Sequence, residues 1–334
     1  MQKVNSIEHI FHIFALLVVC TACNNKTVHQ FSGNGLGTYY QITYEGKENA
    51  NLQKQVDSLL RHYSHEFSIF DTTSALFQIN TNRKVVLGLD FVELLEKSLN
   101  ISEMTNGAFD VTVAPLVTHW GFGPEAFFRT DTHLIDSLRT FVGFRKIAIN
   151  NNLLSKTDER IQLNFNAVAK GYIVDKVAEF IINQYFNNFI VDIGGEVICH
   201  GKKNNVPWKV GIQTPTKDRN GDFASLYTFP LTDRAVATSG NYRNYIENNG
   251  ERYTHIIDPA TGFPQKSNLL SVTVIAEDCL TADALATAFM VMGVEKSLHF
   301  LTQNPQYAAL FILAEKDGGY KVVHSEGFND SMIL

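Results

Sequence analysis

The stretch from Val168 to Ile193 changes its hydrophobic period, and this change constrains the fold most. Apolar residues recur at helical spacing from about Val168 to Gln184, and Asn187-Asn188 then leads into the apolar run Phe189-Ile190-Val191-Asp192-Ile193. A short apolar run bounded by turn residues is typical of a buried strand. The chain therefore combines helices with a sheet, and we expect an α+β or mixed α/β fold.

The same alternation of periods continues along the chain. Asp90 and Glu93 are spaced as a capping pair, which predicts a helix that ends near Asn106-Gly107. A further helix begins near Thr281. The remaining expected elements are a helix with the apolar face Leu52, Val56, Leu59, Leu60 and Tyr63, and strands at Leu36 to Tyr44, Trp208 to Ile212, Ala235 to Thr238 and Leu270 to Ala276. The polar stretch Thr214 to Asp222 is expected to be a surface loop.

Charge and cysteine content exclude two classes of function. The net charge of −6 over 334 residues argues against a nucleic-acid surface, which needs a basic face. No Cys/His spacing matches a zinc site. Cys199 and Cys279 are either two separate half-buried thiols or a bridged pair, and we expect separate thiols because nothing local brings them together.

The N-terminus indicates export. An apolar run over residues 10 to 20 is too short to span a bilayer, follows Lys3, and ends in small residues before Cys23. This pattern is typical of a lipoprotein signal peptide over residues 1–22, with Cys23 as the lipidated residue; an ordinary secretory peptide and an uncleaved anchor are the alternatives. We expect a polar tether over residues 23–31 and a folded domain over residues 32–334.

Two short segments contain the side chains that predict chemistry. The run Thr254 to Gly262 places His255 three positions before Asp258, just ahead of a Pro/Gly turn. Asp283 and Thr287 are four residues apart on the expected C-terminal helix, so they share one face. A carboxylate and a hydroxyl pointing at one spot suit a hard cation such as Mg²⁺. The alternative for this pair is a helix N-cap on a solvated face.

Two turns add candidates for ligand contact. The aromatic and glycine-rich segment from Thr105 to Gly123 allows close approach of the backbone to a planar ligand, or serves packing alone. The turn from Asn164 to Tyr172 can offer a main-chain carbonyl or amide to phosphate or metal. An ordinary helix N-cap by Asn164 or Asn166 explains the second turn equally well.

In their joint order, these segments resemble the ApbE family, the FAD:protein FMN transferases. The resemblance runs from about Gly35 to Gly293. Its matched islands are Gly35-Leu36-Gly37-Thr38, Ser68-Ile69-Phe70 with Ser74 and Asn80, Gly107 to Asp110 through Trp120-Gly121-Phe122-Gly123, Ala169-Lys170-Gly171-Tyr172 with Asp175, Gly194-Gly195, Ala237-Thr238-Ser239-Gly240, His255-Ile256-Ile257-Asp258-Pro259 with Thr261-Gly262, and Ala282-Asp283-Ala284 with Thr287. The resemblance implies one compact domain of two packed lobes, with the flavin site between them.

The resemblance also assigns roles to residues. The Mg²⁺ ligands would be Asp283, Thr287 and the backbone oxygen of Ala167. His255 would be the general base for the acceptor hydroxyl, and Asp258 would either orient His255 or cap the turn. The residues implied for FAD binding are Leu36, Phe70, Ala108, Phe109, Asp110, Asn164, Lys170 and Ile257. Three positions depart from the family pattern: Leu36 replaces Met, Phe70 replaces Tyr, and Asn164 replaces Asp with loss of a charge.

The implied reaction moves FMN from FAD, the substrate, to a Thr or Ser hydroxyl of a membrane redox protein, and releases AMP. Mg²⁺ would neutralise the charge on the diphosphate. The alternatives are an FAD pyrophosphatase, in which water replaces the acceptor, and a non-catalytic FAD-binding lipoprotein. The expected location is the bacterial cell envelope, lipid-anchored and facing the periplasm or outer side. The partners are FAD, the acceptor protein and the membrane, with no nucleic acid.

Overall fold

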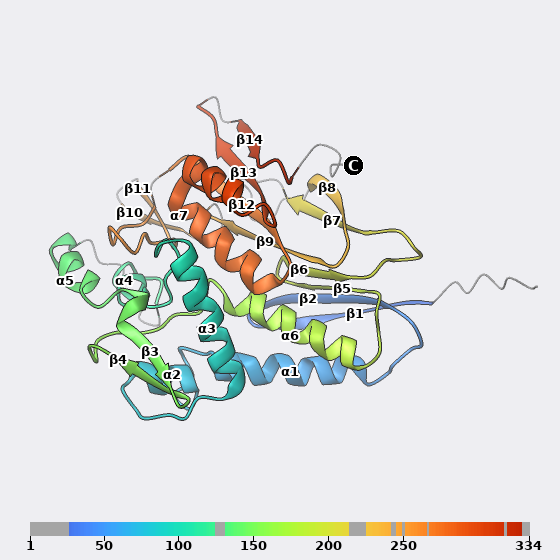
Figure 1. The fold of residues 1–334 in the computed structure, drawn as a ribbon, viewed down its shortest axis with the longest axis horizontal. Helices are drawn as coiled ribbons and strands as arrows, with labels where there is room; N and C mark the ends of the chain where they lie inside the picture. Colours follow the sequence, from blue (N-terminus) through green and yellow to red (C-terminus); the bar gives the residue numbers. More distant parts are fainter. Residues whose placement is uncertain are drawn as a thin grey trace, which may run out of the picture.

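The computed structural model describes residues 27–123, 131–213, 225–241, 245–248, 251–265, 267–316 and 319–328. The predicted signal peptide, the lipidation site Cys23 and the expected loop from Thr214 to Asp222 lie outside these residues. Among the described residues, the fold is built on one large sheet with helices packed against it (Figure 1). The fold class is therefore α+β, as the sequence predicts.

Eight strands form the main sheet in the order β1-β2-β5-β6-β9-β12-β13-β14. Every neighbouring pair is antiparallel. Alternate residues therefore point to opposite faces of the sheet. The strands are β1 (Val28–Gly35), β2 (Thr38–Glu45), β5 (Phe189–Ile193), β6 (Glu196–His200), β9 (Arg234–Gly240), β12 (Leu269–Ala276), β13 (Ala308–Ala314) and β14 (Tyr320–His324).

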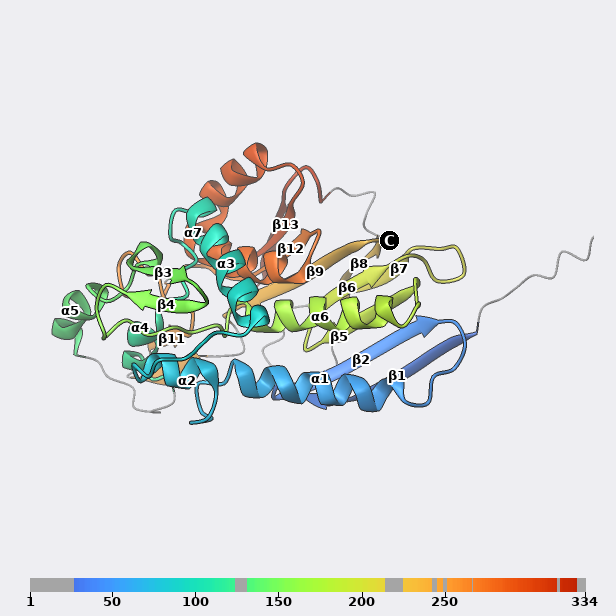
Figure 2. The same ribbon diagram turned by 60° about the horizontal axis from the view of Figure 1, so that its bottom comes forward.

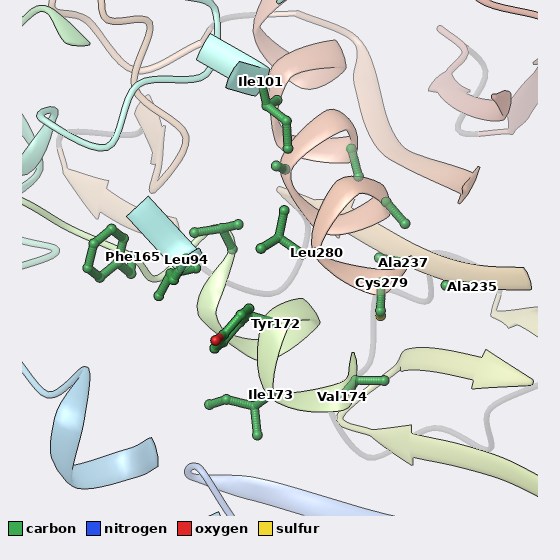
Figure 3. Close-up of a cluster of buried hydrophobic side chains, with 14 of the residues drawn as sticks. Leu94, Ile101, Phe165, Tyr172, Ile173, Val174, Ala235, Ala237, Cys279 and Leu280 are labelled. Atoms are coloured by element: carbon green, nitrogen blue, oxygen red, sulfur yellow. The ribbon is translucent and has the colours of Figure 1, made fainter. Parts of the chain in front are cut away.

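Four long helices cover one face of this sheet, as Figures 1 and 2 show together. They are α1 (Leu52–Glu66), α3 (Leu89–Met104), α6 (Ala169–Asn183) and α7 (Cys279–Gln303). Figure 3 shows part of the core they enclose, where Leu94 of α3, Tyr172 of α6 and Leu280 of α7 meet. The length and hydropathy of α7 would allow it to span a membrane, but half of its apolar window is buried within the fold. It is therefore a core helix of this domain.

A hairpin covers the opposite face of the sheet. Its strands are β7 (Trp208–Gln213) and β8 (Ser225–Leu231), which pair with each other antiparallel. Trp208 and Phe229 pack there against Cys199 and Ile275 in a second hydrophobic core. The sheet is thus buried on both faces, because the side chains that alternate away from the helices meet this hairpin.

Smaller elements form a second lobe beside the sheet, at the left of Figure 1. Leu116, Trp120, Ile135 and Ile257 share a third core in this lobe. The Trp120 indole donates a hydrogen bond to the Gly262 carbonyl at 2.8 Å. The elements are α2 (Ala75–Asn80), α4 (Ala114–His119), α5 (Ile135–Arg139), β3 (Ile147–Asn150), β4 (Leu153–Lys156), β10 (Tyr245–Asn248) and β11 (Glu251–Thr254), with the 3₁₀ turns Thr132–Leu134 and Phe144–Lys146.

Three boundaries differ from the expectations. The strand expected from Leu36 begins at Thr38, because Leu36 and Gly37 have positive φ and form the turn between β1 and β2. Residues 28–31 of the expected tether belong to β1, where pairing with β2 holds them. The predicted capping pair is also wrong. The N-cap of α3 is Gly88, and the Asp90 carboxylate instead accepts hydrogen bonds from the hydroxyl groups of Tyr63 and Tyr172.

The prediction of separate thiols is confirmed, but both side chains are fully buried and not half-buried. Cys199 and Cys279 are both free, buried thiols. Cys199 lies in the core under the hairpin, whereas Cys279 lies in the core on the helix side of the sheet. The sheet therefore separates them. Burial raises the pKa of both thiols, so both remain protonated and act as small core side chains.

Candidate functional site

One cavity of about 1050 Å³ brings the predicted site residues together. Its walls come from the main sheet, from the first turn of α6, from the second and third turns of α7, from β7 and from the second lobe. The predicted residues that line it are Ala108, Phe109, Asp110, Asn164, Ala167, Lys170, His255, Ile257, Asp283 and Thr287. Segments up to 179 positions apart, from Ala108 to Thr287, thus face one space. Leu36, Phe70 and Asp258 are not part of this lining.

The main-chain oxygen of Ala167 is free of the helix that follows it. In a continuous helix, the Gly171 N–H would donate to the carbonyl four residues earlier, which is Ala167. Here that N–H instead donates to Asp283 Oδ2 at 3.1 Å. Among the described backbone hydrogen bonds, none ends on the Ala167 oxygen. The Asp283 carboxylate thereby leaves the carbonyl of Ala167, a residue that lines the same cavity, without a backbone donor.

Asp283 and Thr287 occupy neighbouring positions on one face of α7. Asp283 is 4 % exposed, and burial raises the pKa of its carboxyl group, while the Lys170 ammonium and the Gly171 N–H act against that rise. Thr287 Oγ1 shares a hydrogen bond of 2.9 Å with Ser239 Oγ of β9. The alternative assignment to an N-cap on a solvated face does not hold. The N-cap is Asp278, whose Oδ1 accepts the Thr281 N–H at 2.8 Å.

The donor set fits a hard divalent cation. Asp283, Thr287 and the Ala167 carbonyl offer one carboxylate, one hydroxyl and one main-chain oxygen, which are the ligand types that Mg²⁺ accepts alongside water and phosphate. Within the part of the chain that the structure describes, no group of three or more His, Cys, Asp or Glu side chains is placed to hold a metal. The site differs in kind from such clusters, because only one of its donors is a titratable side chain.

The close crossing of α6 and α7 positions this donor set. Gly171 lies where α6 passes α7, and a Cβ there would overlap the carbonyl oxygen of Cys279 and lie 2.9 Å from Cβ of Asp283. Asp175, one turn further along α6, accepts the N–H groups of Cys279 at 2.7 Å and Leu280 at 2.9 Å. Burial raises the pKa of Asp175 to about 7. The start of α7 is thus tied to α6 through the Asp175 carboxylate and through the hydrogen bond from Gly171 to Asp283.

We expect Gly171→Ala to destabilise the protein by about 1–3 kcal/mol, because the added methyl group has to push two backbones apart. Urea unfolding followed by circular dichroism measures this change. Gly88→Ala is the matched control, since the nearest atom to a Cβ there is the side-chain oxygen of Glu66 at 3.8 Å. Its cost should stay near 1 kcal/mol or below, from the weaker N-cap alone. Equal effects of the two substitutions would contradict the close-packing argument.

A residue that the sequence-based reasoning missed completes the charge pattern of the cavity. Glu196 is the first residue of β6, follows the Gly194-Gly195 turn, and is 3 % exposed. Its Oε2 lies 2.6 Å from Nζ of Lys170, which is 35 % exposed and lines the same cavity. Burial acts against the charge on Lys170, but the carboxylates of Glu196 and Asp283 raise its pKa overall. The acidic residue directly after a Gly-Gly turn was the available signal.

Internal hydrogen bonds hold two of the polar residues that are predicted to bind FAD. Asp110 Oδ1 accepts both the N–H and the hydroxyl of Thr112, and Oδ2 accepts the Phe144 N–H. Burial raises the pKa of Asp110 despite these bonds. Asn164 Oδ1 accepts the Asn166 N–H at 2.8 Å, so its remaining amide group is a donor. Neither Asn164 nor Asn166 caps α6, because the N-cap position is Val168.

His255 and Asp258 make different contacts. His255 lines the cavity and its ring stacks edge-on to Phe122, at 6.2 Å between centroids. The Asp258 side chain accepts the Ala260 N–H at 2.8 Å, and its carbonyl accepts the Gly262 N–H at 2.7 Å. Of the two roles that the sequence left open for Asp258, these bonds match the turn cap. The cap supports the segment from which His255 and Ile257 reach the cavity.

Leu36 and Phe70 lie outside the cavity lining for different reasons. Leu36 occupies the tight turn between β1 and β2 with φ 55°, and it is packed against the main core. Phe70 follows a turn in which the Ser68 hydroxyl accepts the N–H groups of Phe70 and Asp71, and its side chain is 70 % exposed. An exposed aromatic ring of this size is available for contact with a ligand or partner.

Comparison with known proteins identifies the family of the chain. A sequence model of the ApbE family matches residues 36–311. The chain is 36 % identical over 327 residues to an FAD:protein FMN transferase of Vibrio cholerae, covering 94 % of this chain and 96 % of the relative. It is 33 % identical to the protein of that name from Haemophilus influenzae, with 94 % of each chain covered.

Solved structures give the same result. The apo form of the flavinyl transferase ApbE from Pseudomonas stutzeri superposes with a TM-score of 0.82 at 30 % identity, covering 92 % of this chain and 97 % of that one. The flavin transferase ApbE from Vibrio cholerae gives a TM-score of 0.79 at 34 % identity, with 91 % and 98 % covered. The match in sequence spans most of the chain and the match in fold includes the sheet and its helices. The chain therefore belongs to the ApbE family.

Proposed function

We propose that this protein transfers FMN from FAD to a Thr or Ser hydroxyl of another protein, with release of AMP and dependence on Mg²⁺. The observation that carries the proposal is the convergence of Asp283, Thr287 and the Ala167 carbonyl with Lys170 and His255 in one cavity. Relatives that match over nearly the whole chain are named FAD:protein FMN transferases, which supports the same reaction.

The residues of the cavity divide the chemical work. The reaction forms a bond from the acceptor oxygen to the FMN phosphorus and breaks the bond from that phosphorus to the oxygen that leaves with AMP. His255 takes the acceptor proton on an imidazole nitrogen. Lys170 places a positive charge near the diphosphate. Mg²⁺ bound by Asp283, Thr287 and the Ala167 carbonyl would neutralise the charge that develops on the leaving phosphate.

The flavin would contact the other wall of the cavity. We assign FAD binding to the lining residues Ala108, Phe109, Asp110, Asn164, Lys170 and Ile257, and also to Leu36 and Phe70, which lie outside the cavity lining. Phe109 is 3 % exposed and fixed in the core, so its role is to shape the wall. Phe70 is exposed, so its ring is available to pack on a flat ring system. Asn164 can donate through its amide group, which the carboxylate of an Asp could not do.

A transfer assay tests the proposal. The protein without residues 1–23 is mixed with FAD, Mg²⁺ and a candidate acceptor protein, and intact mass and free AMP are measured. A gain of one FMN on the acceptor together with equimolar AMP is the expected result. AMP and free FMN without labelling would identify an FAD pyrophosphatase. The absence of both products would leave a non-catalytic flavin binder. The matched control is an acceptor whose Thr or Ser is replaced by Ala.

We also propose that Cys23 carries a lipid anchor that holds the protein on the bacterial envelope. The apolar run before Cys23 and the polar residues after it support this location. Cys23→Ala in the full-length chain should move the protein from the membrane fraction to the soluble fraction or leave it as an uncleaved precursor. Unchanged fractionation together with an unchanged mature mass would reject the anchor.

A further inference from the structure

Three ionisable groups from three different elements line the cavity. Lys170 is the second residue of α6, Glu196 is the first residue of β6, and Asp283 lies in the second turn of α7. Both carboxylates are almost fully buried, at 3 % and 4 % exposure. A single ammonium group thus lies near two buried carboxylates. The carboxylate with which it forms an ion pair is the one whose charge it neutralises.

Lys170 contacts Glu196 and not Asp283. The Lys170 Nζ to Glu196 Oε2 distance is 2.6 Å, and among the described residues Glu196 is the only carboxylate within ion-pair distance of Lys170. The charge of Asp283 raises the pKa of Lys170 without a hydrogen bond between the two groups. One oxygen of Asp283 accepts the Gly171 N–H, which leaves the other without a cationic partner. Asp283 therefore lines the cavity without a direct ion pair, although the Lys170 ammonium still stabilises its charge from a distance.

The fold fixes the Glu196 side chain where it can hold Lys170. Glu196 pairs with Ile193 across the Gly194-Gly195 turn, at the end of the β5 and β6 ladder. Gly194 has φ 67° and a Cβ there would lie 2.7 Å from Thr38 Cγ2 of the next strand, so the turn is tightly packed. Burial of the Glu196 side chain leaves it few rotamers, whereas Lys170 has a long and flexible stem.

We infer that Glu196 is a positioning residue that holds the Lys170 ammonium away from Asp283 and so keeps Asp283 available for a divalent cation. Without the Glu196 carboxylate, the ammonium would find its nearest buried negative charge at Asp283, because an unpaired charge in a buried site is costly. A cation would then have to displace it. The inference rests on the proposed function, since Asp283 is the metal ligand of that proposal.

The arrangement also separates two positive charges that both serve one diphosphate. A cation bound at Asp283 and an ammonium held at Glu196 would approach the substrate from different elements, α7 and α6. If Lys170 paired with Asp283 instead, one positive charge would take the place of the other. Glu196 thus allows the cavity to present two positive charges to an anionic substrate where it would otherwise present one.

Direct cation binding tests the inference without turnover. Mn²⁺ titration of the flavin-free protein, followed by electron paramagnetic resonance, gives the dissociation constant, and Mg²⁺ competition confirms the site. We expect Glu196→Gln to weaken binding by about tenfold or more, which corresponds to about 1.4 kcal/mol. The double variant Glu196→Gln with Lys170→Met should return to within about threefold of the wild-type constant, because the competing ammonium is gone and the pair is neutral again.

Glu196→Asp separates positioning from charge. This variant keeps the negative charge but withdraws it by one methylene group, so a purely electrostatic effect would leave binding unchanged. A positioning role predicts that Glu196→Asp also weakens Mn²⁺ binding, by more than about threefold. Glu103→Gln is the control, because Glu103 forms an exposed ion pair with Arg145 away from the cavity and should change nothing.

The outcomes of this set are distinct. A wild-type protein that binds no Mn²⁺ would reject the metal site of the proposed function. A wild-type protein that binds Mn²⁺ while Glu196→Gln binds it equally would overturn the inference and leave the metal site standing. Failure of the double variant to recover, although it melts like the wild type, would equally overturn it. If Glu196→Gln does not fold, the double variant and Glu196→Asp carry the test alone.

Discussion

Asp283→Ala should abolish Mg²⁺-dependent release of AMP while leaving FAD bound. Asp283 is the one charged ligand in the proposed donor set, and without it the cation loses its main attraction to the cavity. Metal stabilisation of transition-state charge contributes several kcal/mol, so we expect the rate to fall by about 10³-fold or more. FAD contacts many residues of the cavity wall, and its dissociation constant, measured by flavin fluorescence, should rise far less.

The substitution also removes the acceptor of the Gly171 N–H, so folding has to be controlled. Asp283→Asn keeps an oxygen for that hydrogen bond and removes only the charge. It should fold with a melting temperature near that of the wild type and still lose turnover. Asp278→Asn is the matched control on the same helix, since Asn is as good an N-cap as Asp and Asp278 is outside the cavity lining. Full activity of Asp283→Ala would reject the metal assignment.

The elements with a clear hydrophobic period could be predicted from the sequence alone. The helix face of Leu52, Val56 and Tyr63 is buried in α1, and the apolar run over Phe189–Ile193 is β5. These elements can be recognised from local sequence, because the spacing of their apolar residues shows which faces are buried. The predicted helix from Val168 to Gln184 is likewise observed as α6, within one residue at each end.

The missed features depend on contacts between different elements of the fold. β1 has the sequence of a polar tether, and only its pairing with β2 makes it a strand. Asp90 has the spacing of a capping residue, but its carboxylate accepts hydrogen bonds from tyrosine hydroxyls of α1 and α6. Asp175 supplies the acceptor for the first N–H groups of α7 from another helix. Such interactions leave no spacing signal in the sequence, because the two partners lie in different elements.

The candidate site shows the same division. Asp283 and Thr287 could be paired from their four-residue spacing, and the cavity indeed receives both. The Ala167 carbonyl came from family resemblance alone, and the structure adds the physical reason, which is the diversion of the Gly171 N–H to Asp283. The Gly-Gly turn could have drawn attention to Glu196, but its pairing with Lys170, twenty-six residues earlier, could not be predicted from the sequence.

His255→Ala should slow FMN transfer by about 10²–10⁴-fold, the usual contribution of a positioned general base. His255 lines the cavity in which Asp283 and Thr287 lie, on a segment held by the Asp258 turn and by the Trp120 bond to Gly262. Removal of the imidazole leaves this scaffold intact. The acceptor hydroxyl would then attack without transfer of its proton to a base, whereas FAD would keep most of its contacts.

The measurement is single-turnover transfer of FMN to the acceptor at saturating FAD, together with the dissociation constant of FAD. We expect the rate constant to fall and the dissociation constant to change by less than about threefold, because only the reacting step uses the imidazole. Added imidazole should restore part of the rate to the alanine variant, since the truncated side chain leaves room for it in the cavity. His299→Ala, an exposed position near the C-terminal end of α7, is the control and should transfer FMN at the wild-type rate. Equal rates for His255→Ala and the wild type would remove His255 from the reaction and assign the proton to another acceptor.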